Sequence, residues 1–286
     1  MSKAANSVDG LRDDVVRLKG REDQRRRNRR IYTRRQRRII GVVNLSMFFL
    51  LWELIAVYSN VPQLFLPSFT DVIRELREMS AEGILWGNLW ISTWIYIVGM
   101  IISLAIAIPA GLAIGGISIL DKILTPYVWA VYTTPRLILM PLILLWVGIN
   151  DTARIVIIVL SAVPATLVVV MEGVKTTDTS LLKAAQCFGA GRVQRFRSVV
   201  FPATVPFIAT GVRMGVSRGL IGLFIGELFT AANGIGYIIA TSSKTFNTGR
   251  TYGMLLIFVL FCVAMVGLTQ LLERKVSQWR AQPISA

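Results

Sequence analysis

Long apolar stretches alternate with short polar segments along this chain. Residues 83–120 and residues 251–272 contain no charged side chain. An apolar stretch of about 18 residues or more with few charges is typical of a membrane-spanning helix. The pattern therefore predicts an all-α, polytopic membrane protein. We expect six spans, at Ile39–Tyr58, within Asn88–Gly116, and at Ile123–Val147, Ala153–Met171, Val205–Thr230 and Thr251–Leu272.

The charges between these spans predict how the helices are oriented. Segment 172–204 and the two chain ends are basic, whereas segment 60–87 has four acidic and two basic residues. Because basic loops stay on the cytoplasmic side, we expect both termini and segment 172–204 in the cytoplasm, which agrees with an even number of spans. Lys244 and Arg250 are the exception, since this orientation places their loop (231–250) outside.

Much of the net charge of +15 lies in one tail, because residues 1–38 hold 14 basic and 5 acidic residues. Nucleic-acid binding is one interpretation. The other is a cytoplasmic segment held by anionic lipid beside the first span. A single aromatic residue in the tail, Tyr32, provides little stacking surface for bases and favours lipid. We expect a partly disordered tail at 1–38, a transmembrane domain at 39–272 and a cytoplasmic tail at 273–286.

Several classes of chemistry are excluded by what the sequence lacks. It has no histidine, and its two cysteines, Cys187 and Cys262, lie in different segments. Histidine-based zinc sites, Ser-His-Asp triads and a disulfide framework are therefore excluded. No Gly-x-x-x-x-Gly-Lys-Ser/Thr motif is present to bind ATP phosphates. We expect neither an enzyme active site nor a metal site, and the apolar run after the basic tail is too long for a cleavable signal peptide.

Segment 172–204 is the longest connection between predicted spans. Helical spacing of apolar residues predicts a short helix over Ser180–Phe188, capped by Thr179 or Ser180 and ended by Gly189 or Gly191. A second short helix over Val193–Phe201 is expected to end at Pro202. Two helices joined by a glycine turn form either a docking knob for a partner or an amphipathic hairpin resting on lipid.

The same segment resembles the EAA loop of ABC importer permeases. That family's pattern is Glu-Ala-Ala, three residues, Gly, nine residues, then Ile-x-Leu-Pro. Here Lys183-Ala184-Ala185 is followed after three residues by Gly189 and after nine more by Val199-Val200-Phe201-Pro202. The spacing agrees at every step, while Lys183 reverses the charge of the usual Glu. On this resemblance, the ATPase-coupling residues are Lys183, Ala184, Ala185, Phe188, Gly189, Arg192 and Pro202.

The resemblance extends over about 240 residues and is to the permease group for nitrate, sulfonates and taurine. The other matching segments are Leu66–Ser68, Pro135–Ile149, Thr210–Glu227 and Gly234–Tyr237. It implies a type I importer fold in a bacterial cytoplasmic membrane. It also implies two copies of an ATPase subunit that bind ATP and Mg²⁺, a second permease copy in a homodimer, and an extracytoplasmic solute-binding protein near segments 60–87 and 231–250.

Charged residues inside spans are costly and are candidates for function. Arg136, Arg218 and Glu227 are the candidates for the substrate path, because an arginine fork suits an anion such as a sulfonate, nitrate or carboxylate. The alternative is a structural ion pair, for example of Arg136, Arg213 or Arg218 with Glu227 on a neighbouring helix. This alternative is favoured for Arg213 and Glu227. Pro135 and Pro141 indicate a distorted third span, although ordinary helix packing explains them equally well.

An ion-coupled secondary transporter is the main alternative function. It needs titratable groups in the membrane, and only Glu53 and Glu227 qualify. It also gives segment 172–204 no purpose, so the sequence favours the ATP-driven importer.

Overall fold

A computed structural model describes residues 34–59, 61–230 and 232–276, and within these ranges the chain is helical without a strand. Packing divides the chain into two units, Met1–Val61 and Pro62–Ala286. The first contains the helix α2 (Arg34–Tyr58). The second contains α3 (Phe69–Ala81), α4 (Ile84–Gly116), α5 (Ser118–Thr133), η1 (Arg136–Leu139), α6 (Met140–Val147), α7 (Asp151–Lys175), α8 (Thr179–Cys187), α9 (Arg192–Arg195), η2 (Phe196–Val200), α10 (Phe201–Thr230), α11 (Ile235–Lys244) and α12 (Thr248–Val276).

The predicted all-α, polytopic fold is confirmed. In the described part of the chain, five helical segments are long and apolar enough to cross a membrane, and the number is six if a bent pair of helices is counted as one span. Several predicted spans are shorter than the helices, since α4 begins at Ile84 and α7 continues to Lys175. Sequence analysis also missed α11, a helix between the last two spans.

The predicted third span is the bent pair. α5 and the segment Leu137–Val147 meet at an angle of 88°. Pro135 lies in the break, and Thr134 before it is extended, with φ −68° and ψ 127°. Proline has no N–H to continue a helix and disfavours helical geometry in the preceding residue. The distortion predicted from Pro135 and Pro141 is therefore confirmed, with Pro141 in the first turn of α6.

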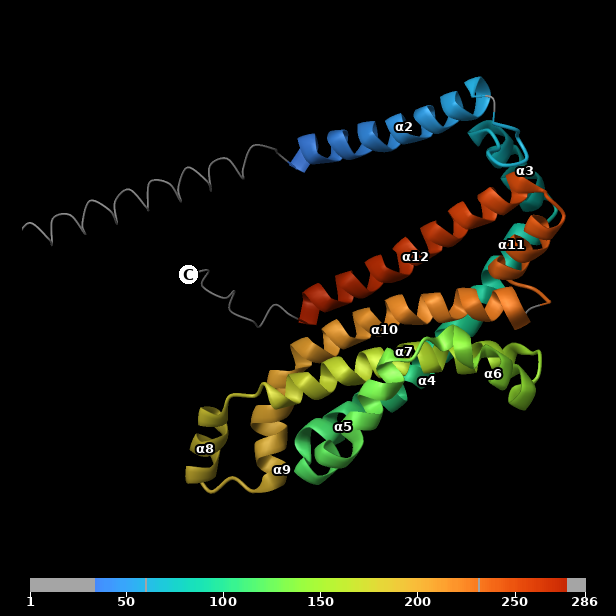
Figure 1. Ribbon diagram of the computed structural model, residues 1–286. Coiled ribbons are helices and arrows are strands. Elements are labelled where there is room, and N and C mark those ends of the chain that lie inside the picture. The colour runs from blue at the N-terminus through green and yellow to red at the C-terminus, as the bar shows by residue number, and fades with distance from the viewer. Residues whose placement is uncertain (1–33, 60, 231, 277–286) are drawn as a thin grey trace, which may run out of the picture. The chain divides into compact units, whose positions relative to one another are not determined.

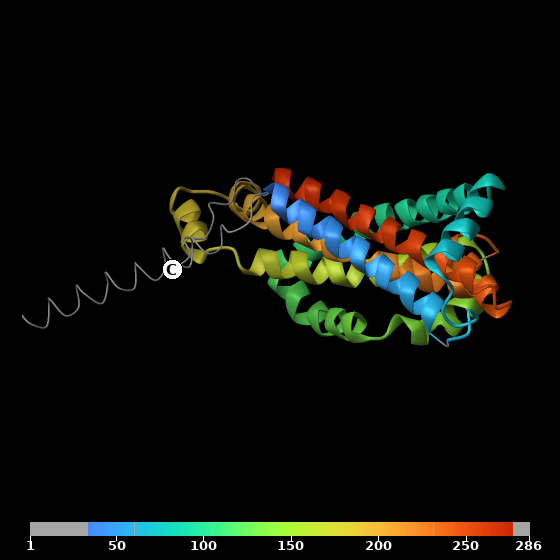
Figure 2. The ribbon, with the colours of Figure 1, turned by 90° about the horizontal axis from the view of Figure 1, so that it is seen from above.

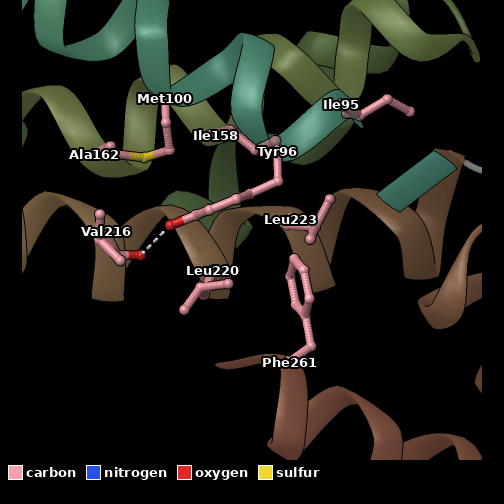
Figure 3. Close-up of a cluster of buried hydrophobic side chains, with 9 residues drawn as sticks. All are labelled: Ile95, Tyr96, Met100, Ile158, Ala162, Val216, Leu220, Leu223 and Phe261. Atoms are coloured by element: carbon pink, nitrogen blue, oxygen red, sulfur yellow. Dashed lines mark hydrogen bonds between the residues drawn. The ribbon is translucent and has the colours of Figure 1, made fainter. Parts of the chain in front are cut away.

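In the second unit, α7 is the central helix and packs most extensively against α4 and α10. Figure 3 shows Tyr96 of α4 extending to α10, where its hydroxyl donates a hydrogen bond of 2.9 Å to the carbonyl oxygen of Val216. Ile158 and Ala162 of α7 complete this contact. Phe261 of α12 meets the Tyr96 ring edge-on, with 5.9 Å between the ring centroids. Four helices thus share one buried apolar cluster.

α10 approaches α7 closely because glycines line the contact. A Cβ atom at Gly222 would lie 2.7 Å from Ser161 Oγ and 3.0 Å from the carbonyl oxygen of Ile157. Small residues let helix backbones approach in a membrane. The glycines of α10 at this contact are Gly211, Gly215, Gly219, Gly222 and Gly226.

The short helices lie at opposite ends of the second unit. α8 and α9 are at one end, and α3 and α11 are at the other (Figure 1). The view from above gives the same arrangement (Figure 2). α8 also runs across the direction of the long helices (Figure 1). The two ends can therefore meet different partners.

Substituting Gly222→Val should destabilise the protein by about 1–3 kcal/mol, because overpacking forces α7 and α10 apart. The measurement is the thermal unfolding midpoint of the purified chain in detergent. Gly267→Val in α12 is the control, since a Cβ there meets nothing within 4 Å. Equal midpoints for the two variants would contradict the close packing of α10 on α7.

Candidate functional site

The hairpin of α8, α9 and η2 projects from one end of the second unit (Figure 1). We call it the α8–α9 knob and define it as residues 178–200. Its first helix, α8, has Asp178 as its N-cap, whose side chain accepts a hydrogen bond of 2.8 Å from the Ser180 N–H. The predicted caps, Thr179 and Ser180, are therefore wrong by one or two residues. Aspartate caps a helix start well because its oxygen satisfies a free N–H of the first turn.

The turn after α8 is a Schellman motif. The N–H of Gly189 donates to the Gln186 carbonyl at 2.9 Å, and the N–H of Ala190 donates to the Ala185 carbonyl at 3.0 Å. Gly189 has φ +78°, a left-handed conformation that favours glycine. The prediction that Gly189 ends this helix is confirmed, while Gly191 precedes α9 as its N-cap, with φ −66°.

The knob exposes both apolar and basic side chains. Phe188 at the tip is 92% exposed, and Leu181 and Val193 are also exposed. Lys183 and Arg192 are exposed as well. A large exposed aromatic residue on a defined turn is typical of a binding surface. Of the other predicted coupling residues, Ala184, Gly189 and Pro202 are exposed and Ala185 is half-buried.

The two arms of the knob are tied together. Arg195 Nη1 donates to Gln186 Oε1 at 3.2 Å, which joins α9 to α8. This bond and the turn hold the exposed residues in a fixed relation.

The second arm does not end at Pro202, contrary to the prediction. A π-helical turn over Phe196–Val200 leads directly into α10, and the Phe201 N–H donates to the Phe196 carbonyl, five residues earlier. Proline clashes with the carbonyl four residues before it in a regular helix. The wider π turn precedes Pro202 and accommodates its ring. One continuous helical segment of 39 residues therefore runs from Arg192 to Thr230.

The structure separates the membrane charges predicted for a substrate path. Arg218 is exposed on α10, whereas Glu227 is only 1% exposed. Arg136 begins η1, and its side chain lies outside the described residues. Arg213 forms a structural ion pair with a different acid, because its Nε lies 3.4 Å from Glu273 Oε2 on α12. Arg213 and Glu227 share one helix, more than three turns apart.

Glu227 instead binds the start of α11. Its Oε1 accepts a hydrogen bond of 2.5 Å from Ser92 Oγ of α4, and its Oε2 accepts one of 2.7 Å from the Gly236 N–H. Ser92 Oγ also accepts the N–H of Ile235 at 2.9 Å, and Asn88 Oδ1 accepts that of Gly234 at 2.6 Å. Side chains from α4 and α10 thus cap α11.

Arg154 of α7 binds the same turn from another side. Its guanidinium donates to the Asn233 carbonyl at 3.2 Å and to Asn233 Oδ1 at 3.0 Å, and it also pairs with Asp151. Arg154 is 2% exposed. Sequence analysis missed Arg154, although a charge inside the apolar fourth span was the signal for it. We name Asn88, Ser92, Arg154 and Glu227 the α11 anchor.

Arg250, one of the two basic residues that did not fit the predicted loop charges, has an acidic partner. Arg250 Nε lies 3.3 Å from Glu75 Oε2 of α3, so the two charges offset one another. The end with α3 and α11 is therefore less basic than its loop sequence indicates.

The chain matches a known protein family. The family model described as "Binding-protein-dependent transport system inner membrane component" matches residues 103–278. This chain belongs to that family. The resemblance to ABC transporter permeases is thus confirmed, and the α8–α9 knob lies within the matched range.

Three curated relatives are similar over most of both chains. The aliphatic sulfonates transport permease SsuC of Bacillus subtilis is 25% identical, covering 84% of this chain and 87% of its own. The taurine transport permease TauC of Escherichia coli is 26% identical, covering 85% and 90%. The riboflavin transport permease RibX of Chloroflexus aurantiacus is 26% identical, covering 84% and 89%.

Solved transporter structures share the fold. The inward-facing MetNI methionine ABC transporter has a chain with TM-score 0.60 and 20% identity, covering 70% of this chain and 99% of that one. An importer of alginate has TM-score 0.57 and 13% identity, covering 85% and 98%. The type I permease architecture expected from the sequence is therefore present.

Gly189→Ala should weaken the knob turn by about 1 kcal/mol, because an L-residue is strained at positive φ. Gly191→Ala is the matched control, since both sites have open space around a Cβ but Gly191 has an ordinary φ. The measurement is hydrogen exchange of the Gly189 and Ala190 amides. Equal exchange in the two variants would refute the role of the left-handed turn.

The Asp178 cap should weaken in acid. The hydrogen bond from the Ser180 N–H, followed by that from the Ser180 side chain, lowers the pKa of Asp178 below its ordinary value of 3.8. A lowered pKa in the fold means that the cap stabilises α8 fully above the ordinary value and is lost as pH falls through the folded pKa. An NMR titration of the Ser180 amide should have its midpoint below 3.8. Asp178→Asn should abolish this titration and keep the helix start, whereas an unshifted midpoint would contradict the cap.

Proposed function

We propose that this chain is the permease subunit of an ATP-driven importer that moves a small anion, such as a sulfonate, nitrate or carboxylate, into the cell. Membership of the permease family supports the transport role. The exposed, rigid α8–α9 knob is the observation on which the rest depends. A separate ATPase supplies the energy, because this sequence contains no phosphate-binding loop for ATP.

The knob is suited to a protein pocket. Phe188 is almost fully exposed at its tip, and Lys183, Arg192 and Arg197 are exposed around it. A partner groove that accepts the phenyl ring and has an acidic rim complements this surface in shape and charge. Movement of such a groove would act on α10 directly, because the second arm of the knob continues into that helix.

The arrangement of partners follows from the two ends of the second unit. Positive charge on the knob favours the cytoplasmic side, where two ATPase subunits with bound ATP and Mg²⁺ would dock on two permease copies in a homodimer. An extracytoplasmic binding protein would deliver the solute at the opposite end, where α3 and α11 lie.

The choice of an anion rests on charge and on the relatives. SsuC and TauC are named for sulfonates and taurine. Arg218 is exposed on α10 and can pair with an anion, as an arginine fork does with sulfonate or carboxylate oxygens. Arg136 is the second candidate from the sequence.

A proton-driven or sodium-driven transporter is less consistent with the environment of Glu227. Both oxygens of this buried carboxyl group already accept hydrogen bonds from protein donors. An ion-coupling carboxylate must exchange its partners during each cycle.

Crosslinking through Cys187 tests the docking. This thiol is exposed on the knob, and Cys262→Ala leaves it as the single cysteine. With the chain's cognate ABC ATPase, we expect crosslinks to cysteines placed in the ATPase groove, and we expect ATP to change their yield.

The control is a single cysteine at Ser243, which is exposed at the opposite end. Equal crosslinking from both positions, or no ATPase copurifying with the unmodified chain, would overturn the proposed coupling. Retained crosslinking with Lys183→Glu together with Arg192→Glu would contradict an acidic rim.

A further inference from the structure

The start of α11 is capped by side chains of other helices. Three consecutive N–H groups, of Gly234, Ile235 and Gly236, donate to Asn88, Ser92 and Glu227. The first N–H groups of a helix have no partner within it and must find one elsewhere. The position of α11 is therefore set by α4 and α10.

Glu227 lies so close to this turn that two glycines are required beside it. A Cβ atom at Gly234 would lie 2.5 Å from Glu227 Oε1, and one at Gly236 would lie 2.6 Å from Glu227 Cβ. Gly234 also has φ +104°. A carboxyl group at a helix start is favoured by the helix dipole. The motif Gly234-Ile235-Gly236 thus fits the carboxyl group of Glu227.

Two buried charged side chains depend on the same four residues. Arg154 binds Asn233, and Glu227 binds Gly236, so residues 233–236 bridge a basic and an acidic group that are both nearly inaccessible. Moving the turn would remove hydrogen bonds from both groups at once, leaving Arg154 with Asp151 and Glu227 with Ser92. Buried polar groups without partners are costly, so the turn is held strongly in place.

The same α10 reaches the knob at its other end. The segment Arg192–Thr230 is one continuous helical run of 39 residues. At about 1.5 Å per residue its contour length is roughly 58 Å, longer than the ~30 Å hydrocarbon core of a membrane. Its first turns form the second arm of the knob, and Glu227 lies in its last turn.

We propose that Glu227 is a positioning residue that locks α11 to the end of α10, so that the knob and the α11 end of the protein move as one body. This inference rests on the proposed function, in which the ATPase acts on the knob and the binding protein acts at the other end. The anchor then transmits the arrival of a loaded binding protein to the ATPase. Ser92 assists by holding the carboxyl group of Glu227 and the N–H of Ile235 together.

The first test measures the anchor in the full chain without partners. Hydrogen exchange of the first turn of α11 should rise roughly tenfold or more in Glu227→Ala and in Ser92→Ala, because each removes a cap of this turn. Ser103→Ala is the matched control. Ser103 is also a fully buried serine of α4, but it donates to the Gly99 carbonyl of its own helix. Unchanged exchange in Glu227→Ala and Ser92→Ala would overturn the proposal.

The second test measures transmission in the assembled transporter. Stimulation of ATP hydrolysis by the solute-loaded binding protein should fall at least fivefold in Ser92→Ala and in Glu227→Gln, while ATPase binding and the unstimulated rate persist. A variant that is only misfolded would lose ATPase binding and the unstimulated rate as well as the stimulation. Ser103→Ala is the control and should keep all three. Full stimulation in both variants would overturn the proposal, as would an equal loss in the control.

Failure of the proposed function is distinguishable from failure of this inference. If the proposed function is wrong, the unmodified chain itself binds no ATPase. If this inference is wrong, the failure is observed only in the variants, and the exchange experiment needs no partner at all.

Discussion

Apolar side chains gain little by leaving lipid, so helices in a membrane associate through close backbone approach and through hydrogen bonds. α10 meets this constraint with five glycines against α7. The contact has no room for a side chain at Gly222, where Ser161 and the backbone of Ile157 already lie. With α10 fixed on α7, the positions of its two ends are fixed as well. The knob at one end and Glu227 at the other both depend on this packing.

Buried polar groups are concentrated where helices must begin or turn. Tyr96 binds the backbone of α10 in mid-helix, but the larger cluster surrounds the turn before α11. Residues 234–236 are buried, so each free N–H of that turn needs a protein acceptor. Asn88, Ser92 and Glu227 provide three acceptors from two helices. The position of the buried Glu227 therefore follows from the geometry of α11.

The α8–α9 knob, unlike the start of α11, satisfies its backbone groups without help from other helices. Its helix start and its turn are satisfied internally, by Asp178 and by the Schellman bonds at Gly189, yet its largest apolar residue is exposed. A segment that needs no partner for its own backbone can present Phe188 without unfolding. The π turn over Phe196–Val200 then joins the knob to α10 without a break. Rigid presentation and direct continuity with a membrane helix are what a mechanical coupling requires.

Much of this architecture could be predicted from the sequence. Apolar length alone identified the spans, because the thickness of the membrane sets the number of residues needed. The kink at Pro135 and the left-handed turn at Gly189 were predictable, since both residues act through their own backbone. The spacing from Lys183 to Pro202 identified the family. The tertiary structure alone decided the role of Glu227, because its partners Ser92 and Gly236 come from other helices. It also decided that Pro202 continues a helix, since the π turn before it depends on atoms five residues away and not on proline itself.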